Sequence, residues 1–267
     1  MQGERIPIGE VTLNVVIRGE GEPVLLAHGF PLDHSMWEAQ INVLATEGYQ
    51  VIAPDLRGFG ASDPAQDKTT MAQFADDLSR LLAKLNVTTP VTFCGLSMGG
   101  YIAWQFFQRH RTRLARLILC DTRANDDDEK VARGRLVMAA EVERFGLDKV
   151  PDTMLPKLLA PVALEKNVAV VEALRASILR QDPAGVAAAQ RGMAERQNVV
   201  DLLPTIDVPT LVLCGEADSI TPPEVMKEIA AAIPAAEYVE IAGAGHMAPM
   251  ERAVEANAAI LNFLKST

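Results

Sequence analysis

The fold is decided by residues 91–110, which read VTFCGLSMGGYIAWQFFQRH. The first four residues form a short apolar run, and residues 98–110 have the length and composition of a helix. Between them lies Gly95-Leu96-Ser97-Met98-Gly99-Gly100, in which the glycines permit a sharp turn that larger side chains would obstruct. A short buried strand that leads directly into a helix is the repeating unit of a parallel, helix-covered sheet.

The same order of strand and helix continues on both sides of this unit. Residues 11–18 alternate partly between polar and apolar side chains, which predicts an exposed antiparallel lead-in that we count as two strands. The remaining strands are short apolar runs, as expected when both faces of a parallel sheet are covered. We therefore predict an α/β fold with a mostly parallel, eight-stranded sheet covered by helices. The other strands are expected at 23–27, 49–54, 91–94, 114–120, 210–214 and 237–241, and the helices at 35–48, 70–86, 98–110, 224–233 and 254–265.

The alternation stops after Asp121 and resumes about ninety residues later. Residues 123–200 contain only helix-like stretches, so we interpret them as an insertion. We expect residues 1–122 and 201–267 to form the α/β core. The insertion should form a helical cap, or lid, over the edge of the sheet where the parallel strands end.

Within the expected cap, two segments have specific helix signals. The acidic run at 126–129 is typical of a solvated helix start. Asp182-Pro183 predicts a second helix start, because proline is favoured at the first helical position. Helix breaks are expected at Gly146, Pro151, Pro156 and Pro161.

Composition excludes several classes of partner. The chain has 267 residues, 49% of them hydrophobic and 22% charged, which is the balance of a soluble globular protein. Its formal net charge of −10 repels phosphate backbones and argues against nucleic acid. The basic run at 109–113 is better explained as the C-terminal end of a helix, where cations are favoured. No apolar run reaches the roughly 18–20 residues needed to span a bilayer, so we expect no membrane association.

Three cysteines, Cys94, Cys120 and Cys214, each end a short apolar run. An odd number of cysteines in buried strands indicates reduced core thiols, not a disulfide framework. Reduced thiols, together with the lack of a secretory signal at the N-terminus, predict a cytoplasmic protein. We expect no metal, because no CxxC or HxxxH spacing occurs.

Ser97 is the candidate nucleophile, because ligands of open parallel sheets bind beyond the carboxyl ends of the strands. A serine hydroxyl needs a base to remove its proton. His246 follows the last strand in a glycine-rich loop at the same edge, and it is our candidate base. His28, on the first loop, is the alternative, although a structural role near the turn suits it better.

The imidazole needs a carboxylate to fix its tautomer and stabilise its charged form. Asp218 follows the strand at 210–214, so its carboxylate is expected at the same edge of the sheet as Ser97 and His246. Asp121, which also follows a central strand, is its rival. An N-cap role for Asp218 is less suitable, since Thr221 stands directly before Pro222-Pro223 and should cap the next helix.

The oxyanion of an acyl-transfer intermediate needs two preorganised N–H donors. One is expected from the backbone of Met98, directly after the nucleophile. The other is expected from Phe30 in the loop His28-Gly29-Phe30-Pro31, because Pro31 has no N–H. Phe30, Met98, Ile220 and Met247 flank these residues, and they either line an apolar substrate site or belong to the core.

These motifs together resemble the α/β-hydrolase superfamily, from about residue 10 to the end except for the lid. Within it, 28–33 and 96–100 are similar to the group of serine esterases, enol-lactonases and cofactor-free haloperoxidases. Ser97 departs from haloalkane dehalogenases and epoxide hydrolases, which have aspartate there. The motifs that carry the resemblance are His28-Gly29-Phe30, the run from Asp55 to Ser62, Gly95 to Gly100, Asp218 and Gly245-His246.

The resemblance implies a Ser97–His246–Asp218 triad, a helical cap and no cofactor. We therefore expect a carboxylesterase- or lactonase-like enzyme that acts on a small-molecule ester or lactone through an acyl-enzyme. The same triad could instead support C–C bond hydrolysis or perhydrolysis, or a slow-turnover ligand receptor. Arg123 could bind an anionic substrate, but a surface position where the lid begins explains it more simply.

Overall fold

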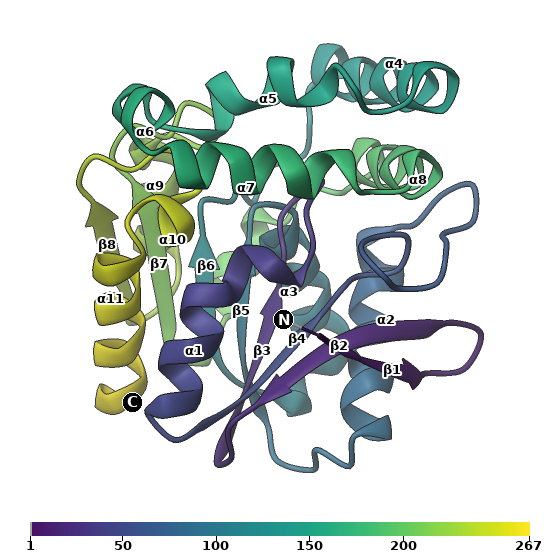
Figure 1. Cartoon of the computed structure of the whole chain (residues 1–267). Coiled ribbons are helices and arrows are strands. Elements are labelled where there is room, and N and C mark those ends of the chain that lie inside the picture. Colours follow the sequence, from purple (N-terminus) through teal and green to yellow (C-terminus); the bar gives the residue numbers. More distant parts are fainter. Residues whose placement is uncertain (1) are drawn as a thin grey trace.

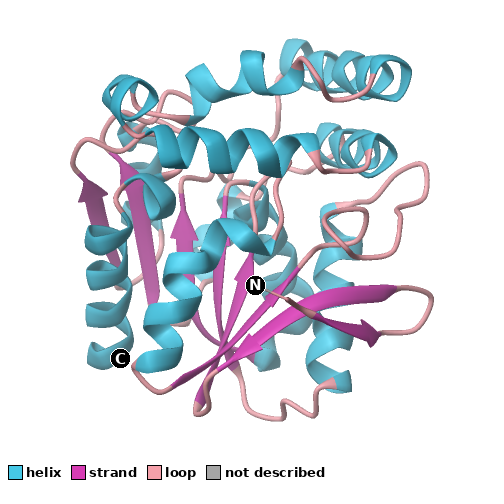
Figure 2. Ribbon diagram, in the orientation of Figure 1, coloured by secondary structure: helices cyan, strands magenta, loops and turns pink. Residues whose placement is uncertain are grey.

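A computed structural model of the chain describes residues 2–267. Eight strands form one sheet in the order β1-β2-β4-β3-β5-β6-β7-β8, with helices on both faces (Figures 1 and 2). Only the pairings of β2 with β1 and with β4 are antiparallel, so the predicted mostly parallel, eight-stranded α/β fold is confirmed. The strands are β1 Glu4–Pro7, β2 Thr12–Arg18, β3 Glu22–Ala27, β4 Tyr49–Pro54, β5 Val91–Leu96, β6 Leu114–Cys120, β7 Thr210–Gly215 and β8 Ala236–Ile241.

Helices cover both faces of this sheet. In Figure 1, α1 and α11 lie on the near face, and α2 and α3 lie behind the sheet. The apolar sides of the helices and the strands form one continuous core. The flanking helices are α1 Glu38–Thr46, α2 Met71–Lys84, α3 Met98–His110, α9 Pro223–Ala232, α10 Ala248–Glu251 and α11 Ala253–Ser266, with 3-10 turns η1 His34–Trp37, η2 Arg111–Arg113 and η3 Val200–Thr205.

The lead-in strand differs from its prediction. β2 was expected to be exposed, but Leu13, Val15 and Val16 are buried. The reason is that β2 does not lie at the edge of the sheet: β1 pairs with one side of it and β4 with the other.

Five helices lie between β6 and β7 in the chain, and we call them the helical layer. In Figure 1 they lie across the top of the molecule, over the end of the sheet toward which the arrows of the central strands point. None of the helices among residues 2–267 combines the length and the apolar character needed to cross a bilayer. The layer consists of α4 Glu129–Phe145, α5 Val150–Leu158, α6 Pro161–Lys166, α7 Val168–Leu179 and α8 Pro183–Ala194.

The helix boundaries in this layer follow the predicted signals with one exception. The Asp182 side chain accepts a hydrogen bond from the Ala184 amide and α8 begins at Pro183, as predicted. Pro156 was expected to break a helix but lies inside α5. The carbonyl that proline leaves without a helical partner belongs to exposed Asp152 in the first turn, where water can solvate it.

The strand register brings the ends of four parallel strands to one edge. Leu96 of β5 pairs with Cys120 of β6, and Cys120 in turn pairs with Leu213 of β7. Gly215, at the end of β7, pairs with Ile241 of β8. Loops that follow these strands therefore begin at nearly the same height beneath the helical layer.

Candidate active site

Ser97 stands on a strained turn between β5 and α3. Its backbone has φ 53° and ψ −108°, a conformation that residues with a side chain rarely adopt. The Ser97 amide donates to the Cys120 carbonyl at 2.9 Å, and the Ser97 carbonyl accepts from the Thr122 hydroxyl at 2.8 Å. A Cβ at Gly95 would lie 2.4 Å from the Gly99 carbonyl, so glycine is required for this close approach. The turn holds the Ser97 side chain partly exposed at the end of the strand.

His246 and Asp218 form a buried pair in the loops that follow β8 and β7. His246 Nδ1 lies 2.8 Å from Asp218 Oδ2, and both residues are at most 3% exposed. Asp218 Oδ1 also accepts from the amides of Ile220 and Thr221, at 2.8 and 3.0 Å. Burial alone would raise the pKa of Asp218, but hydrogen bonds from His246 and Thr221 lower it to about 2. The carboxylate is therefore charged, and it fixes the imidazole with its Nδ1–H directed at Asp218 Oδ2.

Thr221 has a different role from the predicted helix cap. Its hydroxyl donates to Asp218 and lies 3.3 Å from His246 Nδ1. Helix α9 begins at Pro223 without a side-chain cap. The helix begins one residue later than a Thr221 cap would require: Pro222 occupies the N-cap position and has no side-chain acceptor, so the Thr221 hydroxyl is available for the carboxylate.

The other histidines are occupied elsewhere. His28 is fully buried, its Nδ1 lies 2.9 Å from the Gly29 carbonyl, and its Nε2 accepts from the Leu56 amide at 3.0 Å. Burial lowers the pKa of His28, so the ring is neutral and holds the first loop in place. The remaining two are paired with carboxylates, His34 with Asp55 at 2.6 Å and His110 with Asp76 at 2.8 Å.

Asp121, the rival carboxylate, is fully buried and accepts from the Gly215 amide at 2.8 Å. Burial, and after it the neighbouring charge of Asp218, raise the pKa of Asp121 well above the usual range. The two aspartates therefore have opposite pKa shifts, and the one whose pKa is lowered is bonded to His246.

Two backbone amides in the segments next to Ser97 have no hydrogen-bond partner among the described residues. A Cβ at Gly29 would lie 2.7 Å from the Leu96 side chain and 3.8 Å from Ser97 Cβ, so the first loop lies against the turn. Within residues 2–267, the amides of Phe30 and Met98 donate no hydrogen bond to any other group. Unpaired N–H groups beside a serine are suited to a developing oxyanion.

Comparison with known proteins places this arrangement in a family. Residues 22–253 match the family described as the alpha/beta hydrolase fold. The chain belongs to the α/β hydrolases. The predicted resemblance is thereby confirmed.

Relatives of this hydrolase include all three branches of the predicted group. A thermophilic esterase from Thermogutta terrifontis, solved with malate bound, is 44% identical, with a TM-score of 0.96 over 100% of this chain and 99% of its own. The enol-lactonase from Burkholderia xenovorans LB400 is 28% identical, with a TM-score of 0.91 over 98% and 100%. A putative non-heme chloroperoxidase from Synechocystis is 31% identical over 92% of each chain.

The side chains expected to line the substrate site differ in exposure in this hydrolase. Met98 and Met247 are buried in the core, at no more than 1% exposure. Phe30 and Ile220 are only partly buried. The Phe30 ring meets the ring of Phe59 edge-on, with centroids 6.2 Å apart.

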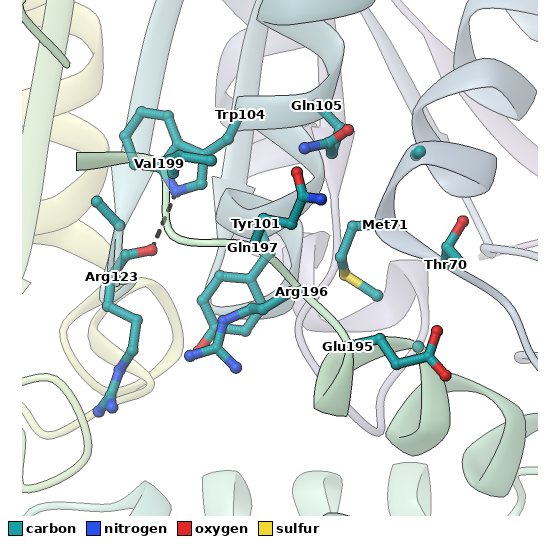
Figure 3. Close-up of a pocket in the computed structure, with 13 residues that line it drawn as sticks. Thr70, Met71, Tyr101, Trp104, Gln105, Arg123, Glu195, Arg196, Gln197 and Val199 are labelled. Atoms are coloured by element: carbon teal, nitrogen blue, oxygen red, sulfur yellow. Dashed lines mark hydrogen bonds between the residues drawn. The ribbon is translucent and has the colours of Figure 1, made fainter. Parts of the chain in front are cut away.

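Arg123 follows β6 and contacts the loop that carries Asp218. It is partly buried, and its guanidinium donates to the Ile220 carbonyl. The Trp104 indole donates to the Arg123 carbonyl at 3.0 Å (Figure 3). Both residues, with Tyr101, line a cavity of about 230 Å³ beside α3. Arg123 is thus partly exposed at the start of residues 123–200, and its side chain also holds the loop that carries Asp218 through the Ile220 carbonyl.

Among residues 2–267 of the hydrolase, two groups of side chains have the spacing to hold a metal ion: Asp33 with His34 and Asp55, and Asp121 with Cys214 and Asp218. Arg180 donates to both Asp33 oxygens, at 2.7 and 2.8 Å, and its positive charge opposes a cation there. In the second group Asp218 is already bonded to His246. Neither donor set suits a metal ion.

Sequence reasoning missed one carboxylate of the site, Glu251. It is buried in α10 and accepts from the amides of Gly245 and Met247, on either side of His246, and of Ala160 in the helical layer. No motif signals this role, because the donors are backbone groups and one of them lies 91 residues away.

Proposed function

We propose that this α/β hydrolase is a serine hydrolase that cleaves a carboxylic ester or a lactone through an acyl-enzyme on Ser97. The observation that carries the proposal is the buried 2.8 Å contact between His246 and Asp218, at the edge where Ser97 stands on its strained turn. The relatives include an esterase and an enol-lactonase, which supports an ester or a lactone as the bond that is cleaved.

In the first step, His246 takes the Ser97 hydroxyl proton while the serine oxygen attacks the carbonyl carbon. The amides of Phe30 and Met98 stabilise the resulting oxyanion, and Asp218 stabilises the imidazolium. His246 then gives its proton to the leaving alcohol as the C–O bond breaks. Water, deprotonated by His246, attacks the acyl-enzyme, and the acid and Ser97 are released.

In this proposal residues 123–200 form a cap over the site. Phe30 and Ile220 are the side chains that would contact the acyl group, because both are partly exposed beside catalytic residues. Met98 contributes its amide and Met247 supports the histidine loop. The small molecule that the site accepts is therefore at least partly apolar near the carbonyl.

The test is steady-state hydrolysis of p-nitrophenyl esters and of a panel of lactones. Ser97→Ala should abolish turnover, and Asp218→Asn should lower kcat by about 10⁴-fold by favouring the wrong histidine tautomer. Asp121→Asn is the matched control, and it should leave kcat nearly unchanged. Substantial turnover by Ser97→Ala would refute the proposal.

The panel also separates the competing functions. A ligand receptor on this fold would show a burst of acylation without steady turnover. A C–C bond hydrolase would be nearly inactive on every simple ester and lactone, and a perhydrolase would transfer the acyl group of an ester to added hydrogen peroxide to give a peracid. Steady turnover of at least one ester or lactone, lost in Ser97→Ala, is the expected result.

A further inference from the structure

The loop that carries His246 is fastened from behind by one buried carboxylate. Glu251 Oε1 accepts from the Gly245 amide at 2.8 Å and from the Met247 amide at 3.2 Å. These two residues flank His246 in the chain. The carboxylate therefore fixes the peptide groups on both sides of the histidine, while Asp218 fixes its ring.

The same carboxylate joins this loop to the helical layer. Glu251 Oε2 accepts from the Ala160 amide at 2.8 Å, and the Met247 amide also lies 3.2 Å from the Leu158 carbonyl. A Cβ at Gly245 would lie 2.4 Å from the Ala160 nitrogen, so only glycine permits this approach. The position of the histidine loop is thus determined by α10 and by the junction of α5 and α6 together.

The chemistry of this contact requires a carboxylate. Three N–H donors converge on two oxygens, and a glutamine in the same place would offer one acceptor and turn an NH₂ group toward a donor. Burial raises the pKa of Glu251, whereas the three amides and the charge of His246 oppose that rise. An ionised Glu251 also favours the imidazolium that forms during the reaction.

We propose that Glu251 is a positioning residue for His246, which keeps the imidazole aligned with Ser97 and makes this alignment depend on the helical layer. The proposal rests on the proposed function. Misplacement of a catalytic group by about 1 Å costs about 100-fold in rate. Loss of the Glu251 contacts should therefore act on kcat more than on substrate binding.

The experiment compares Glu251→Leu and Glu251→Gln with the wild-type protein, and Glu255→Gln is the control. Glu255 lies four residues further on, is exposed and pairs only with Arg252 among the described side chains. Active sites are first titrated with a chromogenic p-nitrophenyl phosphonate. We then measure kcat per titrated site and KM for p-nitrophenyl butyrate, with circular dichroism as a check of folding.

We expect Glu251→Leu to lower kcat per titrated site by about 100-fold with little change in KM. Glu251→Gln should give a smaller loss, since its remaining oxygen can still accept from Gly245 and Met247. Glu255→Gln should match the wild type. A residue that only stabilised the fold would lower the number of titrated sites and leave kcat per site unchanged, and that result would overturn the proposal.

If Glu251→Leu does not fold, Glu251→Gln decides the question by the same criterion, because it preserves size and shape. Failure of the wild-type protein to react with the phosphonate is a separate outcome. It would overturn the proposed serine mechanism, and with it the role assigned to Glu251.

Discussion

The backbone strain at Ser97 makes a measurable prediction about stability. A residue with a side chain in such a conformation costs about 1–3 kcal/mol, whereas glycine adopts positive φ freely. Elsewhere, glycine is less favourable than alanine by about 0.5–1 kcal/mol, since the unfolded chain gains freedom. At Ser97 the first effect should exceed the second. We expect Ser97→Gly to be more stable than Ser97→Ala by about 1 kcal/mol.

Both variants lack the hydroxyl, so its interactions cancel in the comparison. Ser79, in the middle of α2, is the matched control, where Ala should be more stable than Gly by about 1 kcal/mol. Urea unfolding at equilibrium gives each free energy, and 1 kcal/mol corresponds to about 2–4 °C in Tm for a chain of this size. If glycine is the less stable residue at both positions, the turn is not strained and the argument is refuted.

Two other side chains give predictions of their own. Because burial raises its pKa, Asp121 binds its proton more tightly in the folded state than in the unfolded chain, so the folded state loses stability as the pH rises above about 4, where the unfolded chain releases that proton. Asp121→Asn should remove this loss, so its stability relative to the wild type should rise with pH from about 4 upward in urea titrations; a difference independent of pH would contradict it. Arg180→Gln removes two hydrogen bonds from buried Asp33 and should cost about 2 kcal/mol. Arg175→Gln, at an exposed ion pair in α7, the helix that ends just before Arg180, should cost less than about 1 kcal/mol. Equal losses in the two variants would show that the Asp33 contact adds nothing.

The parts of the fold that were predicted from the sequence depend on local patterns. Helix α3 spans 98–110 as expected, because the glycine turn fixes its start and a basic segment its end. α8 begins at Pro183 for an equally local reason. The burial of β2 was not predictable in this way, because it depends on β1 lying at the edge of the sheet in its place.

The same distinction applies to the site. Ser97, Asp218 and His246 could be proposed from the sequence because each follows a predicted strand at one edge of the sheet. Thr221 and Glu251 were not, because their roles depend on contacts made only in three dimensions. Thr221 was expected to cap the next helix, but its hydroxyl donates to Asp218. Glu251 accepts a hydrogen bond from an amide of the helical layer.

The most direct test of the central claim is to trap the covalent intermediate. The enzyme is mixed with p-nitrophenyl butyrate, quenched in acid within the first turnovers and examined by intact and peptide mass spectrometry. We expect one butyryl group per chain, on the peptide that contains Ser97, and none in Ser97→Ala. A butyryl group on another residue, or steady turnover by Ser97→Ala, would contradict the mechanism.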